Sequence, residues 1–289
     1  MKLFKSKKIE KEFQKAYDDL LDGWSIETQS QWVRSEFGET HVIISGPDNG
    51  EPLVLLPGTQ ATAAMWGPVI SKLSSNRRIY SFDLIDQVGR SRPERVLTSS
   101  NDCVEWIEQT LDALNLSKVD IVGNSLGSFI VATFAHSRPT RVNKVILTAP
   151  AATVSNISLL YILQVLITLM LPFKGLTKRF LNTLSQGNVK STSTLYKVLY
   201  LAMSESKVIS KVVPRLLSDK ELSALSMPLL LILGEKDKAN KTKALNIHKK
   251  LLPLIPNVKC KVLPNAGHLW SPEQFKDSGQ LIEEFLSCS

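Results

Sequence analysis

The sequence predicts an α/β protein with a mostly parallel central sheet, helices on both faces and one helical insertion. Short apolar runs, each long enough for one buried strand, recur along the chain, as in Leu53–Leu56 and Leu229–Leu233. Stretches with helical spacing of apolar residues separate them, as in Asp102–Leu114. A chain of 289 residues fits one such domain with an insertion better than two full domains.

Composition predicts a soluble cytoplasmic protein. Apolar residues make up 43% of the chain and charged residues 21%, which is ordinary for a globular domain. Cys103, Cys260 and Cys288 are an odd number without framework spacing, so we expect free thiols and no metal site. The lysine-rich start lacks the apolar core and cleavage site of a signal peptide.

The net charge of +8 is unevenly distributed. Residues 1–15 carry six lysines against two glutamates, and residues 153–222 carry nine basic against three acidic residues. The favoured interpretation is that these lysines only keep the surface soluble. Peripheral association with an anionic membrane stays open. No nucleic-acid partner is expected, because no recognised motif or aromatic-interleaved basic stripe is present.

The N-terminal third predicts a helix followed by a hairpin. Apolar spacing over Lys8–Trp24 favours a helix. Gln31–Phe37 and His41–Ser45 flank Gly38-Glu39 and predict a hairpin at the sheet edge, in which His41 is expected on the surface or at the edge.

The turn after the first buried strand is a candidate functional loop. Leu53–Leu56 stops at Pro57–Gln60, and a helix is expected from Ala61 to about Leu73. Acyl transfer needs two N–H donors for an oxyanion, one of them from such an early loop. Thr59 is the favoured donor and Gln60 the less favoured one. An ordinary strand–helix turn is the alternative interpretation.

The stretch Val119–Gly127 predicts a nucleophile. An apolar strand leads into Gly123-Asn124-Ser125-Leu126-Gly127, and helical character follows. In a strand–turn–helix setting, G-x-S-x-G holds its serine in a strained, exposed turn, with glycines removing clashes. The N–H of Leu126, at the start of the helix, would be the second oxyanion donor.

Two aspartates follow the strand Arg78–Phe82. Asp83 and Asp86 both precede the nucleophile without a second acid motif, so we expect them to shape their loop. Val142–Thr148 predicts the next buried strand. His136 lies near the end of the preceding helix and is expected to cap it or face solvent.

The acid and the base should follow the nucleophile in the chain. Asp237 and Glu235 both lie just beyond an apolar strand, and chemistry alone leaves both open as the acid. His268 follows the last strand, Cys260–Leu263, at the expected active edge of a parallel sheet. His248 is the competing base, but it lies on a lysine-rich helical face.

The order of these motifs resembles the α/β-hydrolase family, and within it the carboxylesterase-like members related to lipases. The matching stretches are Leu55–Gly58, Asp83 with Gly89–Ser91, Gly123–Gly127, Gly234–Asp237 and Asn265–His268. In two respects the chain departs from the family. Pro57 stands where many members have histidine, and the Asp83 loop is about one residue longer than usual.

The resemblance implies a serine esterase that needs no metal or organic cofactor. It implies the triad Ser125, Asp237 and His268, preferring Asp237 over Glu235, with oxyanion donors at Thr59 and Leu126. A small-molecule ester is the implied substrate. Acyl transfer, thioester cleavage, carbon–carbon hydrolysis and a ligand-binding protein of low turnover stay open, because function depends on the site rather than the scaffold.

The domain prediction places a basic helix at residues 1–24, the core at 25–152 and 223–289, and a helical cap at 153–222. Within the cap, Ile157–Phe173 is apolar except at Ser158, Tyr161, Gln164 and Thr168. We expect this helix to be buried between core and cap or to line an acyl pocket, which favours a hydrophobic acyl substrate. Interfacial use stays open, and the length is at the short limit for a membrane span. The sequence does not indicate which oligomeric state the protein adopts.

Overall fold

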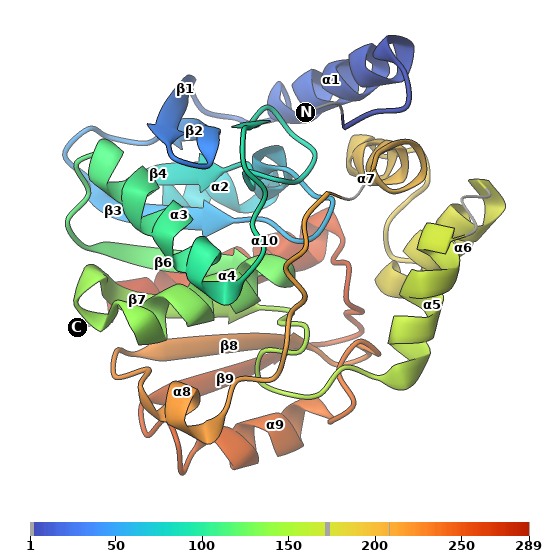
Figure 1. The fold of residues 1–289 in the computed structure, drawn as a ribbon. Helices are drawn as coiled ribbons and strands as arrows, with labels where there is room; N and C mark the ends of the chain where they lie inside the picture. Colours follow the sequence, from blue (N-terminus) through green and yellow to red (C-terminus); the bar gives the residue numbers. More distant parts are fainter. Residues whose placement is uncertain (1–2, 171–173, 208, 289) are drawn as a thin grey trace.

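A central sheet organises the chain in this computed structural model, which describes residues 3–170, 174–207 and 209–288 (Figure 1). In those ranges eight strands lie in the order β1-β2-β4-β3-β6-β7-β8-β9, and the short β5 pairs with β2. The strands are β1 (Thr28–Ser35), β2 (Gly38–Ser45), β3 (Glu51–Leu56), β4 (Arg77–Phe82), β5 (Arg92–Pro93), β6 (Val119–Asn124), β7 (Val142–Thr148), β8 (Leu229–Gly234) and β9 (Val258–Leu263).

Strand direction confirms the predicted mostly parallel sheet. The ladders from β4 through β3, β6, β7 and β8 to β9 are all parallel, whereas β1 and β2 pair antiparallel at one edge. The turns that follow β3, β6, β8 and β9 therefore come together at one edge of the sheet.

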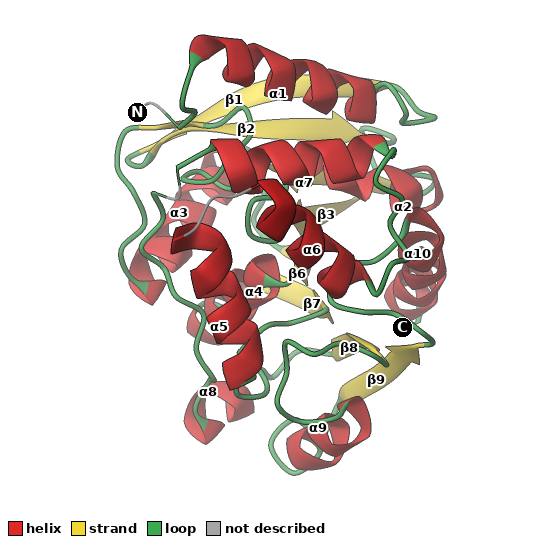
Figure 2. Ribbon diagram, turned by 90° about the vertical axis from the view of Figure 1, so that its right-hand side faces the viewer, coloured by secondary structure: helices red, strands yellow, loops and turns green. Residues whose placement is uncertain are grey.

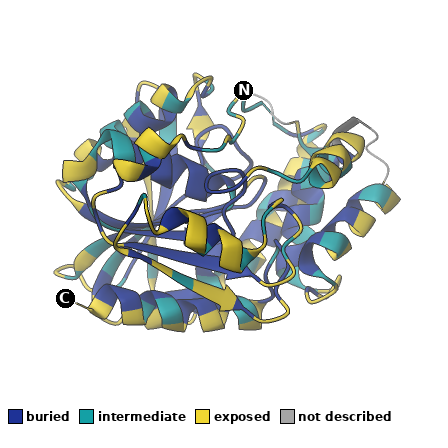
Figure 3. Cartoon of the chain, turned by 90° about the horizontal axis from the view of Figure 1, so that it is seen from below, coloured by how far each residue is buried: buried dark blue, intermediate teal, exposed yellow. Residues whose placement is uncertain are grey.

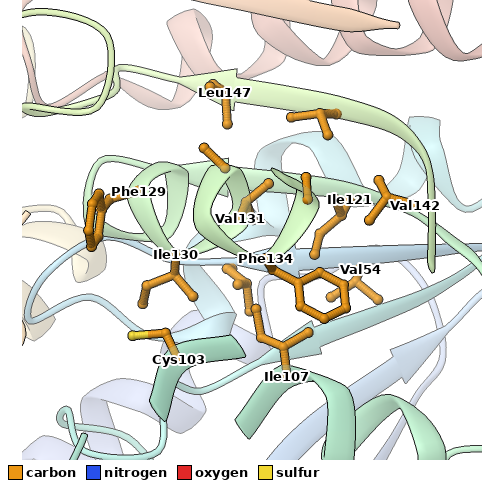
Figure 4. Close-up of a cluster of buried hydrophobic side chains, with 14 of the residues drawn as sticks. Val54, Cys103, Ile107, Ile121, Phe129, Ile130, Val131, Phe134, Val142 and Leu147 are labelled. Carbon is orange, nitrogen blue, oxygen red and sulfur yellow. The ribbon is translucent and has the colours of Figure 1, made fainter. Parts of the chain in front are cut away.

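Helices cover both faces of the sheet (Figure 2). They are α1 (Lys7–Leu21), η1 (Ala63–Trp66), α2 (Gly67–Leu73), α3 (Ser100–Ala113), α4 (Leu126–Ser137), η2 (Pro139–Arg141), α5 (Leu159–Met170), α6 (Lys174–Ser185), α7 (Thr194–Glu205), α8 (Asp219–Ser223), α9 (Ala244–Leu251) and α10 (Pro272–Ser287). Two apolar clusters result, one on each face. In the first, side chains of α3, α4 and the sheet meet, among them Ile107, Phe134 and Val54 (Figure 4). The second joins the sheet to α1, α2, α7 and α10.

Burial follows this layering. The central strands are buried, while exposed residues gather on the outer sides of the helices and on the edge strand β9 (Figure 3). The three cysteines are free thiols. Burial raises the pKa of Cys103 to about 12 and that of Cys260 to about 11.

The helix expected over residues 61–73 is split. A 3-10 turn, Ala63–Trp66, precedes the α-helix that begins at Gly67. Pro68 lies in the first turn of α2, where its missing N–H costs no hydrogen bond. A short strand, β5, also forms where none was predicted.

The prediction for His41 was wrong, because its side chain is fully buried. Helix α1 packs over β2. The Tyr17 hydroxyl of that helix and the His41 ring both form hydrogen bonds to the buried Asp83 carboxylate. The His41 Nδ1 lies 2.9 Å from the Asp83 carboxylate, and the Trp32 ring packs against the imidazole. A histidine on a second strand is therefore enclosed by a helix from outside the hairpin.

Three helices, α5, α6 and α7, lie together beyond the sheet, on the side toward the viewer in Figure 2. The N–H of Leu269 donates to the carbonyl of Leu184, which fastens α6 to the loop that carries His268. A bridge between Phe4 and Ser206 fastens the end of α7 to the N-terminal segment. The proposed cap limits at residues 153 and 222 stay a prediction.

The expectation that the apolar helix of the cap is buried between core and cap was wrong for one of its sides, and its use in lining an acyl pocket stays a prediction. One side of α5 faces the body of the protein, but Leu159, Leu160 and Leu163 on the other side are at least half exposed. The final part of the predicted run, residues 171–173, lies outside the described residues. Among the helices described, none is long and apolar enough to cross a membrane.

Candidate active site

Ser125 occupies the sharp turn between β6 and α4. Its backbone has φ 50° and ψ −110°, a conformation that residues with a Cβ rarely adopt. A Cβ on Gly123 would lie 2.3 Å from the backbone oxygen of Gly127, and one on Gly127 would lie 2.5 Å from that of Leu56. The two glycines are therefore required by close backbone packing, which holds the strained serine at the end of the strand.

The structure brings the three predicted polar residues together at the carboxyl edge of the sheet. The Ser125 Oγ lies 2.8 Å from the His268 Nε2, and the His268 Nδ1 lies 2.9 Å from the Asp237 Oδ2. The imidazole and the carboxylate are both largely buried. The second Asp237 oxygen accepts the N–H of Ala239 at 2.8 Å, which orients the carboxylate toward the ring.

The loops that carry the acid and the histidine are tied to each other. The N–H of Lys236 donates to the carbonyl of Ala266, and the exposed Glu235 carboxylate accepts the N–H of Asn265 at 2.8 Å. Glu235 therefore braces the turn before His268 from the solvent side, whereas Asp237 is the residue whose carboxylate reaches the ring.

The predicted oxyanion loop lies against the serine. A Cβ on Gly58 would come within 3.3 Å of the Ser125 Cβ, so the turn after β3 passes directly beside the nucleophile position. Gln60, the alternative donor, has φ 56°, and its N–H donates to the Gln87 side chain at 3.2 Å. Leu126 is the first residue of α4, where a backbone N–H has no acceptor within the helix. Within the described residues, no acceptor is found for the N–H of Thr59.

Asp83 and Asp86 shape their loop, as the sequence predicts. Asp83 is fully buried and accepts the Tyr17 hydroxyl and the backbone N–H groups of Ala63 and Arg90. Asp86 accepts the N–H of Leu97, and burial raises the pKa of its carboxyl above the usual range. Asp83 thereby holds η1, and with it the start of the segment after the oxyanion loop.

Sequence reasoning assigned no role to Tyr161, a residue of α5. Its ring packs edge-on against the His268 ring with centroids 5.5 Å apart, and the centroid of the Phe180 ring of α6 lies 6.2 Å from that of Tyr161. Burial, with the Asp237 carboxylate nearby, raises the pKa of the Tyr161 hydroxyl. A signal existed in the sequence, because polar residues at 161, 164 and 168 share one face of a helix.

The remaining histidines lie away from this site. His136, in the last turn of α4, lies 3.7 Å from the Glu221 carboxylate of α8, and burial lowers its pKa. His248 is on α9, as the sequence predicts. Over the part of the chain that the structure covers, no three of the His, Cys, Asp and Glu side chains are grouped to hold a metal ion.

Comparisons with known proteins agree with this architecture. The family pattern described as alpha/beta hydrolase fold matches residues 51–174. Carboxylesterase YbfK of Bacillus subtilis is 28% identical over 281 residues, which cover 95% of this chain and 93% of that protein. The crystal structure of carboxylesterase CesB (YbfK) from Bacillus subtilis superposes with a TM-score of 0.89 at 26% identity, covering 97% of this chain and 99% of the other.

The chain belongs to the α/β-hydrolase fold family. A second Bacillus subtilis structure, that of naproxen esterase, is similar with a TM-score of 0.87 at 27% identity, covering 95% of this chain and 97% of the other. The protein is therefore a carboxylesterase-like α/β hydrolase, about 27% identical in sequence to these Bacillus subtilis esterases. The fold expected from its motifs is confirmed.

Proposed function

We propose that this α/β hydrolase cleaves carboxylic esters through an acyl-enzyme on Ser125. The observation that supports it most is the unbroken hydrogen-bond chain from the Ser125 Oγ through His268 to Asp237. A serine hydroxyl is too weak an acid to attack an ester unaided, so a base within 2.8 Å is what the chemistry needs.

In the acylation step, the Ser125 Oγ attacks the ester carbonyl carbon while the His268 Nε2 accepts the hydroxyl proton. Asp237 holds the ring with its Nδ1 proton toward the carboxylate and stabilises the imidazolium. The tetrahedral oxyanion collapses, the carbon–oxygen bond to the alcohol breaks, and His268 returns the proton to the leaving alcohol. Water then repeats these steps on the acyl-enzyme, releasing the acid and restoring the Ser125 hydroxyl.

The oxyanion would be bound by the backbone N–H groups of Thr59 and Leu126. Both belong to turns that meet at Ser125. Leu126 is also the first residue of α4, and the positive end of that helix dipole would stabilise the developing negative charge. The hydrogen bond from Gln60 to Gln87 occupies the alternative N–H, which favours Thr59. Each such donor contributes about 2.7–4 kcal/mol to transition-state stabilisation.

A hydrophobic acyl group is the proposed substrate feature. Tyr161 and Phe180 place aromatic surface next to His268, where the acyl or alcohol part of a bound ester must pass. Both relatives in the comparisons carry esterase names, one a carboxylesterase and one a naproxen esterase, which supports ester chemistry over the alternatives on this scaffold.

Hydrolysis of p-nitrophenyl esters with acyl chains from short to long tests the proposal, using the natural sequence and Ser125→Ala. We expect turnover that depends on Ser125, free acid as the acyl product, and the highest kcat/KM with medium or long chains. Absence of Ser125-dependent turnover on every ester would overturn the proposed function. Transfer of the acyl group to an added alcohol in place of free acid would reassign the chain to acyl transfer.

A further inference from the structure

Helix α5 presents an exposed apolar surface to solvent. More than half of the large apolar side chains that are exposed in the described part of the chain lie on this one helix, and Leu159 is 80% exposed. We call this surface the leucine face; its residues are Leu159, Leu160, Ile162, Leu163, Leu166 and Ile167. Soluble proteins rarely leave a contiguous apolar patch of this kind without a binding role.

The pattern of α5 is inverted relative to an ordinary surface helix. Its polar residues Tyr161, Gln164 and Thr168 lie on one side and are half-buried or buried, whereas the leucine face occupies the opposite side. Ordinary packing turns the apolar side inward. The inward side of α5 is instead the one that brings Tyr161 to His268, so the same helix connects the leucine face with the candidate active site.

The part of the cap that contains α5 and α6 carries basic residues and no acidic ones. Residues 121–204 contain no aspartate or glutamate, and within that range the cap contributes five basic residues: Lys174, Lys178, Arg179, Lys190 and Lys197. Lys178 and Arg179 are exposed on α6, which lies beside α5 in the same layer (Figure 2). Lys174 at the start of α6 lies 4.0 Å from the Glu205 carboxylate, whereas Lys178 and Arg179 lie further along that helix. An apolar face beside such cations matches the chemistry of an anionic lipid surface, which offers acyl chains beneath negatively charged headgroups.

We propose that the leucine face docks onto an anionic lipid surface, with the basic side chains of α6 contacting the headgroups. A second copy of this chain is a poorer occupant, because a symmetric contact through this face would bring Lys178 and Arg179 of the two copies toward each other. The proposal rests on the proposed function for its substrate class, a water-insoluble ester that enters from the lipid surface past Tyr161. The docking itself does not depend on turnover.

Binding is therefore measured with the Ser125→Ala chain, by co-sedimentation with vesicles of phosphatidylcholine alone or mixed with phosphatidylglycerol. We expect binding to the anionic vesicles that weakens as salt is added. Leu159→Gln with Leu163→Gln should lower the partition constant about tenfold or more, since apolar burial drives insertion. Leu245→Gln with Leu252→Gln is the matched control and should bind normally; these exposed leucines lie in the first turn of α9 and just beyond its end.

The charge contribution has its own pair of variants. Lys178→Glu with Arg179→Glu should reduce binding to anionic vesicles about tenfold or more, because each basic side chain near such a surface contributes to the attraction. Lys72→Glu with Lys118→Glu changes the net charge equally at the opposite edge of the sheet and should have a much smaller effect. Equal losses from both pairs would overturn the docking geometry.

Two further outcomes would overturn the proposal. The first is equal binding to anionic vesicles by the Ser125→Ala chain with and without the Leu159 and Leu163 substitutions. The second is a dimer in solution that the same variant dissociates, which would assign the leucine face to a second copy. Turnover of a short, water-soluble p-nitrophenyl ester is followed separately with the natural serine. Failure there and on every longer ester of the series contradicts the proposed esterase function and leaves the vesicle result standing.

Discussion

Two Ser–His–Asp hydrogen-bond chains occur in the described part of the protein, and their comparison indicates what a reactive serine requires. In one, the Ser125 Oγ is 2.8 Å from His268, whose other nitrogen is 2.9 Å from Asp237. In the other, the Ser30 Oγ is 3.1 Å from the His41 Nε2, whose Nδ1 is 2.9 Å from Asp83. Side-chain geometry alone barely separates them.

The backbone at each serine separates them. Ser125 has φ 50° at the start of α4, where the N–H groups of the first turn have no acceptor within the helix. Ser30 lies within the edge strand β1, paired with Ile43 in a regular antiparallel ladder, and no helix starts beside it. A charge that developed on a carbonyl oxygen next to Ser30 would therefore have no preorganised pair of donors.

The acids differ as well. Asp83 is surrounded by donors, since it accepts the Tyr17 hydroxyl and the N–H groups of Ala63 and Arg90 in addition to contacting His41. It joins α1, η1 and the loop after β4 to the sheet. Asp237 has the N–H of Ala239 and the His268 ring. Under the proposed function the first chain serves catalysis, whereas the second holds elements of the fold together.

The largest expected effect is the loss of ester hydrolysis in Ser125→Ala. We expect a decrease in kcat of roughly 10⁴-fold or more with unchanged thermal unfolding, because the nucleophile is lost while its small side chain makes little packing. Ser30→Ala is the matched control, and p-nitrophenyl ester turnover is the measurement. Comparable losses in the two variants would break the distinction between the serines.

Asp237→Asn should have the next largest effect. We expect a decrease in kcat of about 10⁴-fold with little change in stability, because an amide favours the wrong imidazole tautomer. Glu235→Gln retains an oxygen that accepts the Asn265 N–H, so its turnover should stay within about twofold. Steady-state kinetics of both variants checks this. Equal losses would remove the assignment of Asp237 as the acid.

Asp83→Asn should show the opposite profile from Asp237→Asn. An amide nitrogen placed among the Tyr17 hydroxyl and backbone donors leaves buried groups unpaired, which should cost about 2–4 kcal/mol in the free energy of unfolding. Urea unfolding of both variants measures the difference. An unchanged unfolding free energy in Asp83→Asn would contradict its structural role.

Tyr161 tests the contribution of the cap, with a smaller expected effect. Tyr161→Ala removes the ring that packs on His268 and should lower kcat/KM for a long-chain ester about tenfold. Tyr161→Phe keeps the ring and should stay within about twofold, because no hydrogen bond of the hydroxyl is involved in the proposed mechanism. If the phenylalanine variant were as impaired as the alanine variant, the hydroxyl and not the ring would be the functional group.

Most of the fold could be predicted because its signals are local. Apolar runs such as Leu229–Leu233 predict buried strands wherever they occur, and G-x-S-x-G after such a run predicts the turn at Ser125. The same holds for the polar residues that follow β8 and β9, since parallel strands bring their carboxyl ends together. These features depend on residues close to one another in the chain.

What could not be predicted depends on contacts between distant segments. His41 is buried because α1 folds back over β2, which no pattern near residue 41 indicates. The exposure of α5 was missed for another reason, because the prediction relied on its apolar composition, which does not tell which side faces the protein. The positions of its polar residues carried that information, and Tyr161 marks the inward side.

Labelling with an organofluorophosphonate, followed by intact-mass analysis and peptide mapping, tests the central claim most directly. The reagent reports which serine is a nucleophile without any assumption about the natural ester. We predict one adduct per chain, located on Ser125, absent in Ser125→Ala and undiminished in Ser30→Ala. An adduct on Ser30, or none on Ser125 in the folded natural sequence, would contradict the account.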